Sequence, residues 1–266
     1  MTHFVDEKPL VIAGREFKSR LFMGSGKFAS NELMAAAWEA GGTECVTVAI
    51  RRIDVTPERK DKNFIDFIDR EQVQLLPNTA GCFDLESALR IARLARAATG
   101  TNWIKVEVLG DEKTLLPDVA ATIEAVKILK AEGFVVLPYT TQDPVAARRL
   151  FEAGADTVMP LASPIGSGQG LPDFTGLQFI IEELSGKLPI IVDAGIGAPS
   201  DAALAMELGA DACLINTAIA LAKDPVLMAR AMAKGVKAGR MAHLAGRIPK
   251  KRYASASSPM EGRIGS

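Results

Sequence analysis

The chain has 266 residues, a net charge of −1 and 48% apolar residues, which is typical of a globular protein with a sizeable core. The balanced charge gives no indication of binding to nucleic acid or to an acidic membrane surface, and no apolar run approaches the length of a membrane span. Cysteines stand far apart, at positions 45, 82 and 213, so we expect reduced thiols and neither a disulfide framework nor a zinc site. The first residues lack the order of a signal peptide, and we expect a cytoplasmic location.

The first expected element is a short β-hairpin over 10–17 that turns at Ala13-Gly14, and we interpret it as a plug or cap on the main fold. After it, continuously apolar strands alternate with helices, several of which end at glycine. We expect strands over 20–24, 44–50, 73–77, 103–108, 134–138, 156–160, 188–193 and 211–216, and helices over 30–40, 64–70, 85–98, 117–132, 144–153, 177–184, 199–208 and 225–244.

A local repeat supports this alternation. Residues 152–159 resemble residues 207–214, and both read as a helix end, a glycine and a buried strand. Eight such strands favour a closed parallel barrel, an α/β (β/α)8 TIM barrel, over an open doubly wound sheet. No dinucleotide-binding fingerprint follows the first strand. No linker divides the chain, so we expect one domain over 1–266, with an N-terminal arm and hairpin over 1–18 and a flexible tail over 254–266.

The strand over 103–108 carries two charges. Trp103, Lys105 and Glu107 share one face, and aliphatic residues fill the other. A buried charge is costly unless it is paired or functional. Two interpretations stay open: a structural ion pair of Lys105 with Glu107 or Asp193, or a lysine that forms a Schiff base with a carbonyl.

The Schiff-base interpretation needs a free amine. Burial lowers the pKa of a lysine, and nearby carboxylates raise it. Such chemistry also needs groups that transfer protons. The only two histidines, His3 and His243, lie in the N-terminal arm and in the last helix, so Glu107 and Asp193 are the candidate acid–base pair.

Glycine-rich loops follow the sixth and seventh strands, and the polar pair Asn216-Thr217 ends the eighth. Barrels often bind phosphate between the last two loops and a short extra helix, which we expect within 218–222. Gly195 and Gly197 would let the backbone approach an anion, Gly166 would close the other side, and Asn216 and Thr217 would add polar donors. Each glycine alone could merely form a tight turn. We expect backbone donors to suffice without a separate cationic group.

Other reactive side chains rank lower. Arg51 and Arg52 directly follow the second strand and could reach the same end of the barrel. Cys82 lies in the loop after the third strand and could be exposed, and we expect a spectator thiol there and not a nucleophile. Cys45 and Cys213 lie within strands and are predicted to be core residues.

Several segments resemble one enzyme family, the bacterial thiazole synthases. The segments are Leu76-Pro-Asn-Thr-Ala-Gly81, Ile104-Lys-Val-Glu-Val108, Leu137-Pro-Tyr-Thr140, Ala162-Ser-Pro-Ile-Gly-Ser-Gly-Gln-Gly170, Val192-Asp-Ala-Gly-Ile-Gly197 and Leu214-Ile-Asn-Thr217. The resemblance runs from about Gly14 to about Pro259. The loop over 163–170 together with the lysine strand is its most specific part.

This resemblance implies an enzyme that forms the thiazole phosphate of thiamine. Its substrates would be 1-deoxy-D-xylulose 5-phosphate, the glycine-derived imine dehydroglycine, and sulfur from a carrier protein that ends in a thiocarboxylate. Lys105 would form the imine, and Glu107 and Asp193 would move protons. The implied substrate and phosphate contacts are Gly166, Ala194, Gly195, Asn216 and Thr217.

The family resemblance also implies a cytoplasmic homotetramer that binds the sulfur carrier, and the enzyme that makes the glycine imine is a candidate partner. We expect neither a metal nor a cofactor. Two alternatives stay open. One is another phosphosugar-binding barrel enzyme, of isomerase or aldolase type, that uses Glu107 and Asp193 without covalent catalysis. The other is a non-catalytic scaffold for the sulfur carrier.

Overall fold

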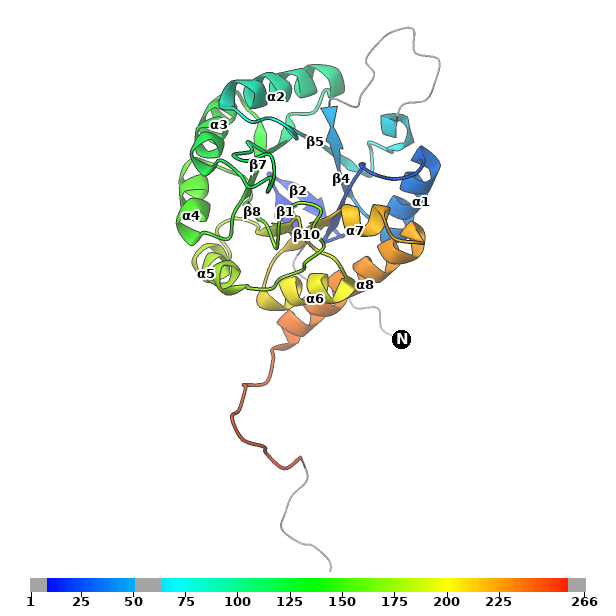
Figure 1. Ribbon diagram of the computed structural model, residues 1–266, viewed down its shortest axis with the longest axis vertical. Coiled ribbons are helices and arrows are strands. Elements are labelled where there is room, and N and C mark those ends of the chain that lie inside the picture. Colours follow the sequence, from blue (N-terminus) through cyan, green and yellow to red (C-terminus); the bar gives the residue numbers. More distant parts are fainter. Residues whose placement is uncertain (1–8, 51–63, 258–266) are drawn as a thin grey trace, which may run out of the picture.

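Eight parallel strands form a barrel that helices surround (Figure 1). The computed structural model describes residues 9–50 and 64–257. Neighbouring strands follow the order β8-β7-β6-β5-β4-β3-β10-β9. Parallel bridges from Val158 to Ile190 and from Leu161 to Asp193 join the two ends of this order, and we call this junction the seam. The strands are β3 (Leu21–Gly24), β4 (Cys45–Ala49), β5 (Gln74–Asn78), β6 (Trp103–Val106), β7 (Val135–Thr140), β8 (Met159–Pro160), β9 (Ile191–Asp193) and β10 (Ala212–Ile215).

The helices begin at capping residues that the sequence makes visible. Ser30, Asp84, Asp118, Asp143 and Asp224 each accept a hydrogen bond from a backbone amide in the first turn of the helix that follows. The helices are α1 (Asn31–Gly41), α2 (Leu85–Thr99), α3 (Val119–Ala131), α4 (Pro144–Glu152), α5 (Thr175–Leu184), α6 (Pro199–Leu208), α7 (Thr217–Ala220) and α8 (Pro225–Ala245). The predicted TIM barrel is therefore confirmed, and α7 is the short extra helix expected after the eighth strand.

The helix expected over 64–70 is wrong in extent, because only a 3-10 helix, η2 (Phe64–Phe67), forms there. Asp69 explains the early end. Its Oδ1 accepts a hydrogen bond from the Glu71 amide at 3.0 Å, and its carbonyl accepts one from the Val73 amide at 2.8 Å. Such local bonds compete with helix continuation, and the chain turns into β5 instead.

The hairpin of β1 (Leu10–Ile12) and β2 (Arg15–Phe17) closes one end of the barrel, as predicted. In Figure 1 it lies behind the barrel centre. Phe17 packs against Phe22 and Trp103, with ring centroids 5.3 and 6.0 Å apart. The buried residues of this cluster, which we call the plug, are Leu10, Ile12, Phe17, Phe22, Cys45, Leu76, Trp103, Leu137, Met159, Ile191, Ala212 and Leu214.

A second core lies between the barrel and its helices. Ile104, Val106 and Val108 belong to it, whereas Trp103 belongs to the plug, so the predicted division of faces in this strand is confirmed. Cys45 and Cys213 are buried as predicted, and burial raises the pKa of the Cys213 thiol to about 12. The open question of whether Cys82 is exposed is answered, because the residue is 1% exposed. The loop folds inward through bonds from Cys82 N to Thr79 O and from Leu109 N to Cys82 O.

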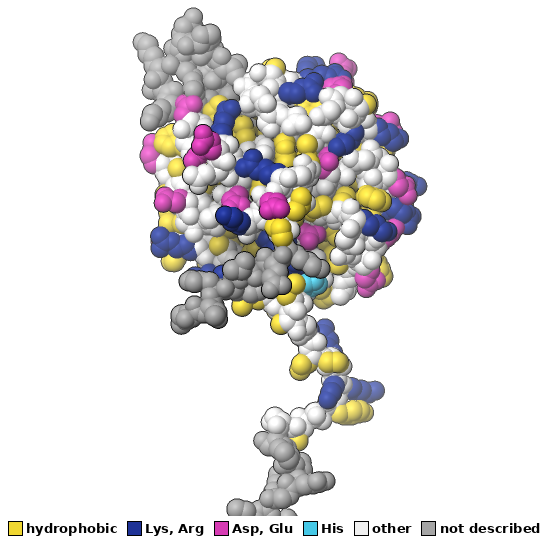
Figure 2. All heavy atoms as spheres, turned by 180° about the vertical axis from the view of Figure 1, so that it is seen from behind, with side chains coloured by type: hydrophobic (Ala, Val, Ile, Leu, Met, Phe, Trp, Pro, Cys, Tyr) yellow, Lys and Arg dark blue, Asp and Glu magenta, His cyan; other side chains and the backbone are white. Residues whose placement is uncertain are grey.

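The predictions for the N-terminal arm, for Arg51 and Arg52 and for the C-terminal tail are not tested by the structure. Residues 246–257 extend away from the barrel without a helix or strand (Figure 1), while the arm before residue 9 and the arginines Arg51 and Arg52 lie outside the described residues. The division into arm, barrel and tail stays a prediction. Seen from behind, basic and acidic side chains are interspersed on the surface (Figure 2). None of the described helices has the length and apolar character needed to cross a membrane.

Candidate functional site

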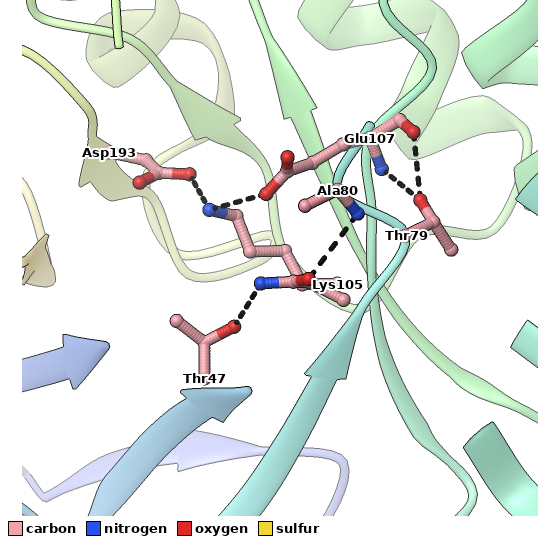
Figure 3. Close-up of polar contacts among 7 residues, drawn as sticks. Thr47, Thr79, Ala80, Lys105, Glu107 and Asp193 are labelled. Carbon is pink, nitrogen blue, oxygen red and sulfur yellow. Dashed lines mark hydrogen bonds and ion pairs between the residues drawn. The ribbon is translucent and has the colours of Figure 1, made fainter. Parts of the chain in front are cut away.

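Lys105 lies between two carboxylates inside the barrel (Figure 3). Its Nζ is 2.5 Å from Asp193 Oδ2 and 3.1 Å from Glu107 Oε1. All three residues are buried, with exposed fractions of 5%, 5% and 3% for Lys105, Glu107 and Asp193. They come from β6, from the residue just after β6, and from the end of β9. The structure therefore brings together the three residues that the sequence singled out.

The two carboxylates dominate the protonation of the lysine. Burial lowers the pKa of Lys105. The charges and hydrogen bonds of Asp193 and Glu107 raise it by more than burial lowers it, so the pKa lies above its ordinary value. The resting amine is therefore an ammonium. To attack a carbonyl it must lose this proton, and the carboxylates at 2.5 and 3.1 Å are the nearest acceptors.

Tyr139 is a neighbour that sequence reasoning did not assign to the site. Lys105 Nζ lies 5.8 Å from the centroid of its ring, within the range of a cation–π contact. The side chain is fully buried, and its hydroxyl has no hydrogen-bond partner in the described structure. Burial, together with the Asp193 and Glu107 charges, raises the pKa of this phenol, so it stays protonated and can only donate to an ionised neighbour.

The end of β5 holds the strand that carries Lys105 in place. Thr79 Oγ1 donates to the Glu107 carbonyl and accepts from the Glu107 amide, both at 2.8 Å (Figure 3). Asn78 pairs with Lys105 in the sheet, and its side chain donates to Thr47 Oγ1 at 3.0 Å and accepts from the Ala80 amide at 3.3 Å. The polar run Asn78-Thr79 at a strand end was the sequence signal for this support.

A cavity of about 520 Å³ opens at the carboxyl end of the strands. It is large enough for a small phosphorylated substrate. All eight residues predicted for the site line it: Lys105, Glu107, Asp193, Gly166, Ala194, Gly195, Asn216 and Thr217. The lysine cluster and the glycine loops thus face one space, as the barrel interpretation requires. The roles of these residues stay predictions.

The glycine loops pack so closely that side chains would not fit. A β-carbon on Gly195 would lie 2.4 Å from the Ser163 amide, and one on Gly197 would lie 2.2 Å from the Gly168 carbonyl. Gly195 also has a φ of 75°, next to Ala194 with a φ of 61°. Loop packing alone therefore requires glycine at 195 and 197. Their use in anion binding is a separate prediction.

Three groups near the expected anion site donate to protein partners: the Gly197 and Ala198 amides and the Asn216 side chain. The Gly197 and Ala198 amides, at the start of α6, both donate to Asp201 Oδ2, at 3.0 and 2.8 Å, so a protein carboxylate already occupies that helix terminus. The Asn216 side chain donates to the Gly26 carbonyl at 3.2 Å, and it thereby fixes the loop after β3. These donors are less free than the sequence argument assumed.

The loop after β3 contributes a cation that the sequence argument missed. Lys27 lines the cavity, and its Nζ lies 3.4 Å from the point that a β-carbon on Gly166 would occupy. The signal was the run Gly24-Ser25-Gly26-Lys27 at the end of a barrel strand. Within the described part of the chain, no group of His, Cys, Asp and Glu side chains could hold a metal ion.

Comparison with known proteins shows which family the chain belongs to. The model of the family described as "Thiazole biosynthesis protein ThiG" matches residues 11–259. The chain belongs to the ThiG family. Thiazole synthases of Thermodesulfovibrio yellowstonii and Solibacter usitatus are 55% and 56% identical to this chain, over 96% of it and 98% of each relative.

A solved structure agrees with the ThiG assignment. A chain of the Amycolatopsis orientalis BexX/CysO complex is 34% identical, with a TM-score of 0.82, and the match covers 93% of this chain and all of the other. This ThiG-family chain is therefore an enzyme of thiazole formation, and the prediction from the sequence motifs is confirmed. The family match does not support the alternative of a non-catalytic scaffold.

Proposed function

We propose that this thiazole synthase works through an imine on Lys105, and that it joins 1-deoxy-D-xylulose 5-phosphate, dehydroglycine and carrier-bound sulfur into the thiazole phosphate of thiamine. One observation carries the proposal. A buried lysine contacts two carboxylates at 2.5 and 3.1 Å and faces the same cavity as three glycine-rich loops. This arrangement provides a nucleophile, two proton carriers and room for a phosphate at a distance from the reacting carbon.

The chemistry begins with a proton transfer. Asp193 or Glu107 takes a proton from the Lys105 ammonium when the sugar ketone enters. The free amine adds to the ketone carbon, the protonated carboxyl returns its proton to the oxygen, and water leaves. A carboxylate then removes a proton from the neighbouring carbon, and the carbonyl function moves along the chain. The carrier thiocarboxylate adds its sulfur to this carbonyl carbon, and the carrier leaves as a carboxylate that takes the carbonyl oxygen. The sulfur then adds to the imine carbon of dehydroglycine, and the nitrogen of dehydroglycine adds to the carbon bound to Lys105 and displaces the lysine as an amine. Loss of one water from the sugar chain completes the ring.

Trapping with borohydride tests the covalent step. The enzyme is incubated with 1-deoxy-D-xylulose 5-phosphate and borohydride, digested, and mapped by mass spectrometry. We expect a stable adduct on the peptide that contains Lys105. Lys105→Arg keeps the positive charge in the cavity and cannot form the imine, so it serves as the control and should remain unlabelled. An adduct on another lysine, or none, would refute the imine.

A non-covalent mechanism, as in phosphosugar isomerases, makes the opposite prediction. It leaves catalysis to Glu107 and Asp193, so Lys105→Ala would keep full activity in thiazole formation. The same variant under the imine mechanism is inactive even when every substrate is saturating.

The partners and the assembly belong to this proposal as well. The likeness to a chain solved in the BexX/CysO complex supports a protein partner, and we assign this role to a sulfur carrier protein that ends in a thiocarboxylate. An enzyme that supplies the glycine imine is a further candidate partner. A homotetramer in the cytoplasm completes the proposal, and sedimentation of the purified protein tests the assembly.

A further inference from the structure

The cavity that Lys105 lines contains a second lysine, Lys27. It follows β3, whereas Lys105 lies on β6, and both line the same space. Lys27 Nζ is 3.4 Å from the β-carbon position of Gly166, and Thr217 Oγ1 is 3.8 Å from the same point. Loops from three strands therefore converge where the substrate phosphate is expected.

Two hydrogen bonds hold the loop that carries Lys27 in place. Asn216 Nδ2 donates to the Gly26 carbonyl at 3.2 Å, and the Ser25 amide donates to the Thr47 carbonyl at 3.1 Å. A side chain on Gly24 would approach the Asn216 carboxamide to 2.7 Å, so glycine permits this packing. Lys27 itself has a φ of 69°, a left-handed conformation that a residue with a β-carbon seldom adopts without a reason.

Lys27 is also electrostatically available. Across residues 9–50 and 64–257, no carboxylate forms an ion pair with it. The two buried carboxylates of the cavity are both in contact with Lys105. An ammonium without a carboxylate partner, held by a strained loop against glycine-rich backbone, is suited to bind a phosphate dianion.

We propose that Lys27 is the cationic contact for the phosphate of the sugar substrate, and that it makes the enzyme selective for the phosphorylated ketose. Asn216 is a positioning residue for Lys27, because its Nδ2 donates to the carbonyl of Gly26, the residue just before Lys27. This inference rests on the proposed function, and it adds a residue that the backbone-only expectation for the phosphate left out.

A comparison of substrates with and without phosphate tests this role. Lys27→Gln should raise the concentration of 1-deoxy-D-xylulose 5-phosphate that half-saturates borohydride trapping by at least about tenfold, while trapping at saturation stays as fast as in the wild type. With unphosphorylated 1-deoxy-D-xylulose, the same variant should match the wild type. Lys223→Gln removes an exposed lysine outside the lining of the cavity and serves as the matched control, with a change below about twofold.

Further measurements separate charge from loop structure. Lys27→Arg should restore most of the affinity. Lys27→Asn removes the charge with a residue that tolerates a positive φ, so it reports on the charge if Lys27→Gln folds poorly. Added salt should weaken sugar-phosphate binding more in the wild type than in Lys27→Asn, because salt screens an accessible charge.

Two results overturn the proposal: wild-type affinity in Lys27→Asn and Lys27→Gln, or an equal loss for the phosphorylated and unphosphorylated sugars. If no imine forms, isothermal titration calorimetry of the sugar phosphate without borohydride measures the same change in affinity. A failed Lys105 trap with a phosphate-specific Lys27 effect would therefore remove the imine mechanism and leave Lys27 in its role.

Discussion

The two ends of the barrel are built from the same strands but differ in chemistry. One end is filled by the plug, in which Phe17 packs on Phe22 and Trp103. The other is a cavity of about 520 Å³ lined by charges and glycines. Strand β6 shows the change over two residues, because Trp103 belongs to the plug and Lys105 to the cavity. A barrel can thus keep an unfavourable buried charge cluster at one end, because apolar burial at the other stabilises the strands that carry it.

Removal of the reactive group at the open end should have the largest effect. Lys105→Ala should lower thiazole formation by at least about 10³-fold, because the nucleophile is lost. Circular dichroism and thermal unfolding should show a folded barrel. Activity within tenfold of the wild type would contradict covalent catalysis.

At the closed end we expect a large effect on stability and little on chemistry. Phe17→Ala should lower the free energy of unfolding by about 3–5 kcal/mol, since it leaves a cavity among the rings of the plug. Urea unfolding measures the loss, and activity per folded molecule should be kept below the transition. Glu16→Ala, on the exposed side of the same strand, should change stability by less than about 0.5 kcal/mol. Equal losses in the two variants would show that the plug does not stabilise the barrel.

At the charged end, Lys105 should make the free energy of unfolding depend on pH. The pKa of Lys105 is raised above its ordinary value of 10.5 in the folded state, so its contribution is fully present below that pH and is lost as the pH rises through the folded value. The difference in unfolding free energy between the wild type and Lys105→Met should be constant from pH 7 to 9. Above about pH 10.5 it should fall by up to about 1.4 kcal/mol per pH unit. A difference that rises between pH 7 and 9 would mean a lowered pKa, because the unfolded chain would then hold the proton that the folded lysine has lost.

The smallest effect should come from Gly166, and a second glycine isolates it. Gly166 and Gly186 have similar φ values, 75° and 78°, so alanine at either position should lower stability by about 1 kcal/mol. Only the β-carbon at 166 would meet Lys27 Nζ, at 3.4 Å, since nothing lies within 4 Å of the one at 186. Gly166→Ala alone should therefore weaken sugar-phosphate binding. Equal affinity in both variants would move the phosphate away from this loop.

Residue types and periodicity were enough to predict much of this arrangement. The period of two in β6 placed Lys105 and Glu107 on the inner face, and the position of Asp193 at a strand end placed it beside them. The glycines after β8 and β9 marked the loops that line the cavity. Strand and helix alternation predicted the barrel, because each apolar strand needs a helix to cover its outer face.

What the sequence could not show depends on loop conformation. The direction of Lys27 follows from a φ of 69° and from the bond between Asn216 and Gly26, which joins residues 190 positions apart. The burial of Cys82 follows from backbone bonds that fold its loop under the outer core. The early end of η2 follows from side-chain and backbone bonds at Asp69. None of these has a periodic signal.

Asp193 both joins the seam of the barrel and contacts Lys105. This residue forms the bridge with Leu161, and its carbonyl accepts a hydrogen bond from the Ala162 amide at 3.1 Å, while its carboxylate is in contact with Lys105. A chain in which β8 and β9 have not yet joined lacks the geometry that gives Lys105 its nearest proton acceptor. Under the proposed imine mechanism, the pairing of β8 with β9 therefore also sets the position of one of the two carboxylates that exchange a proton with Lys105.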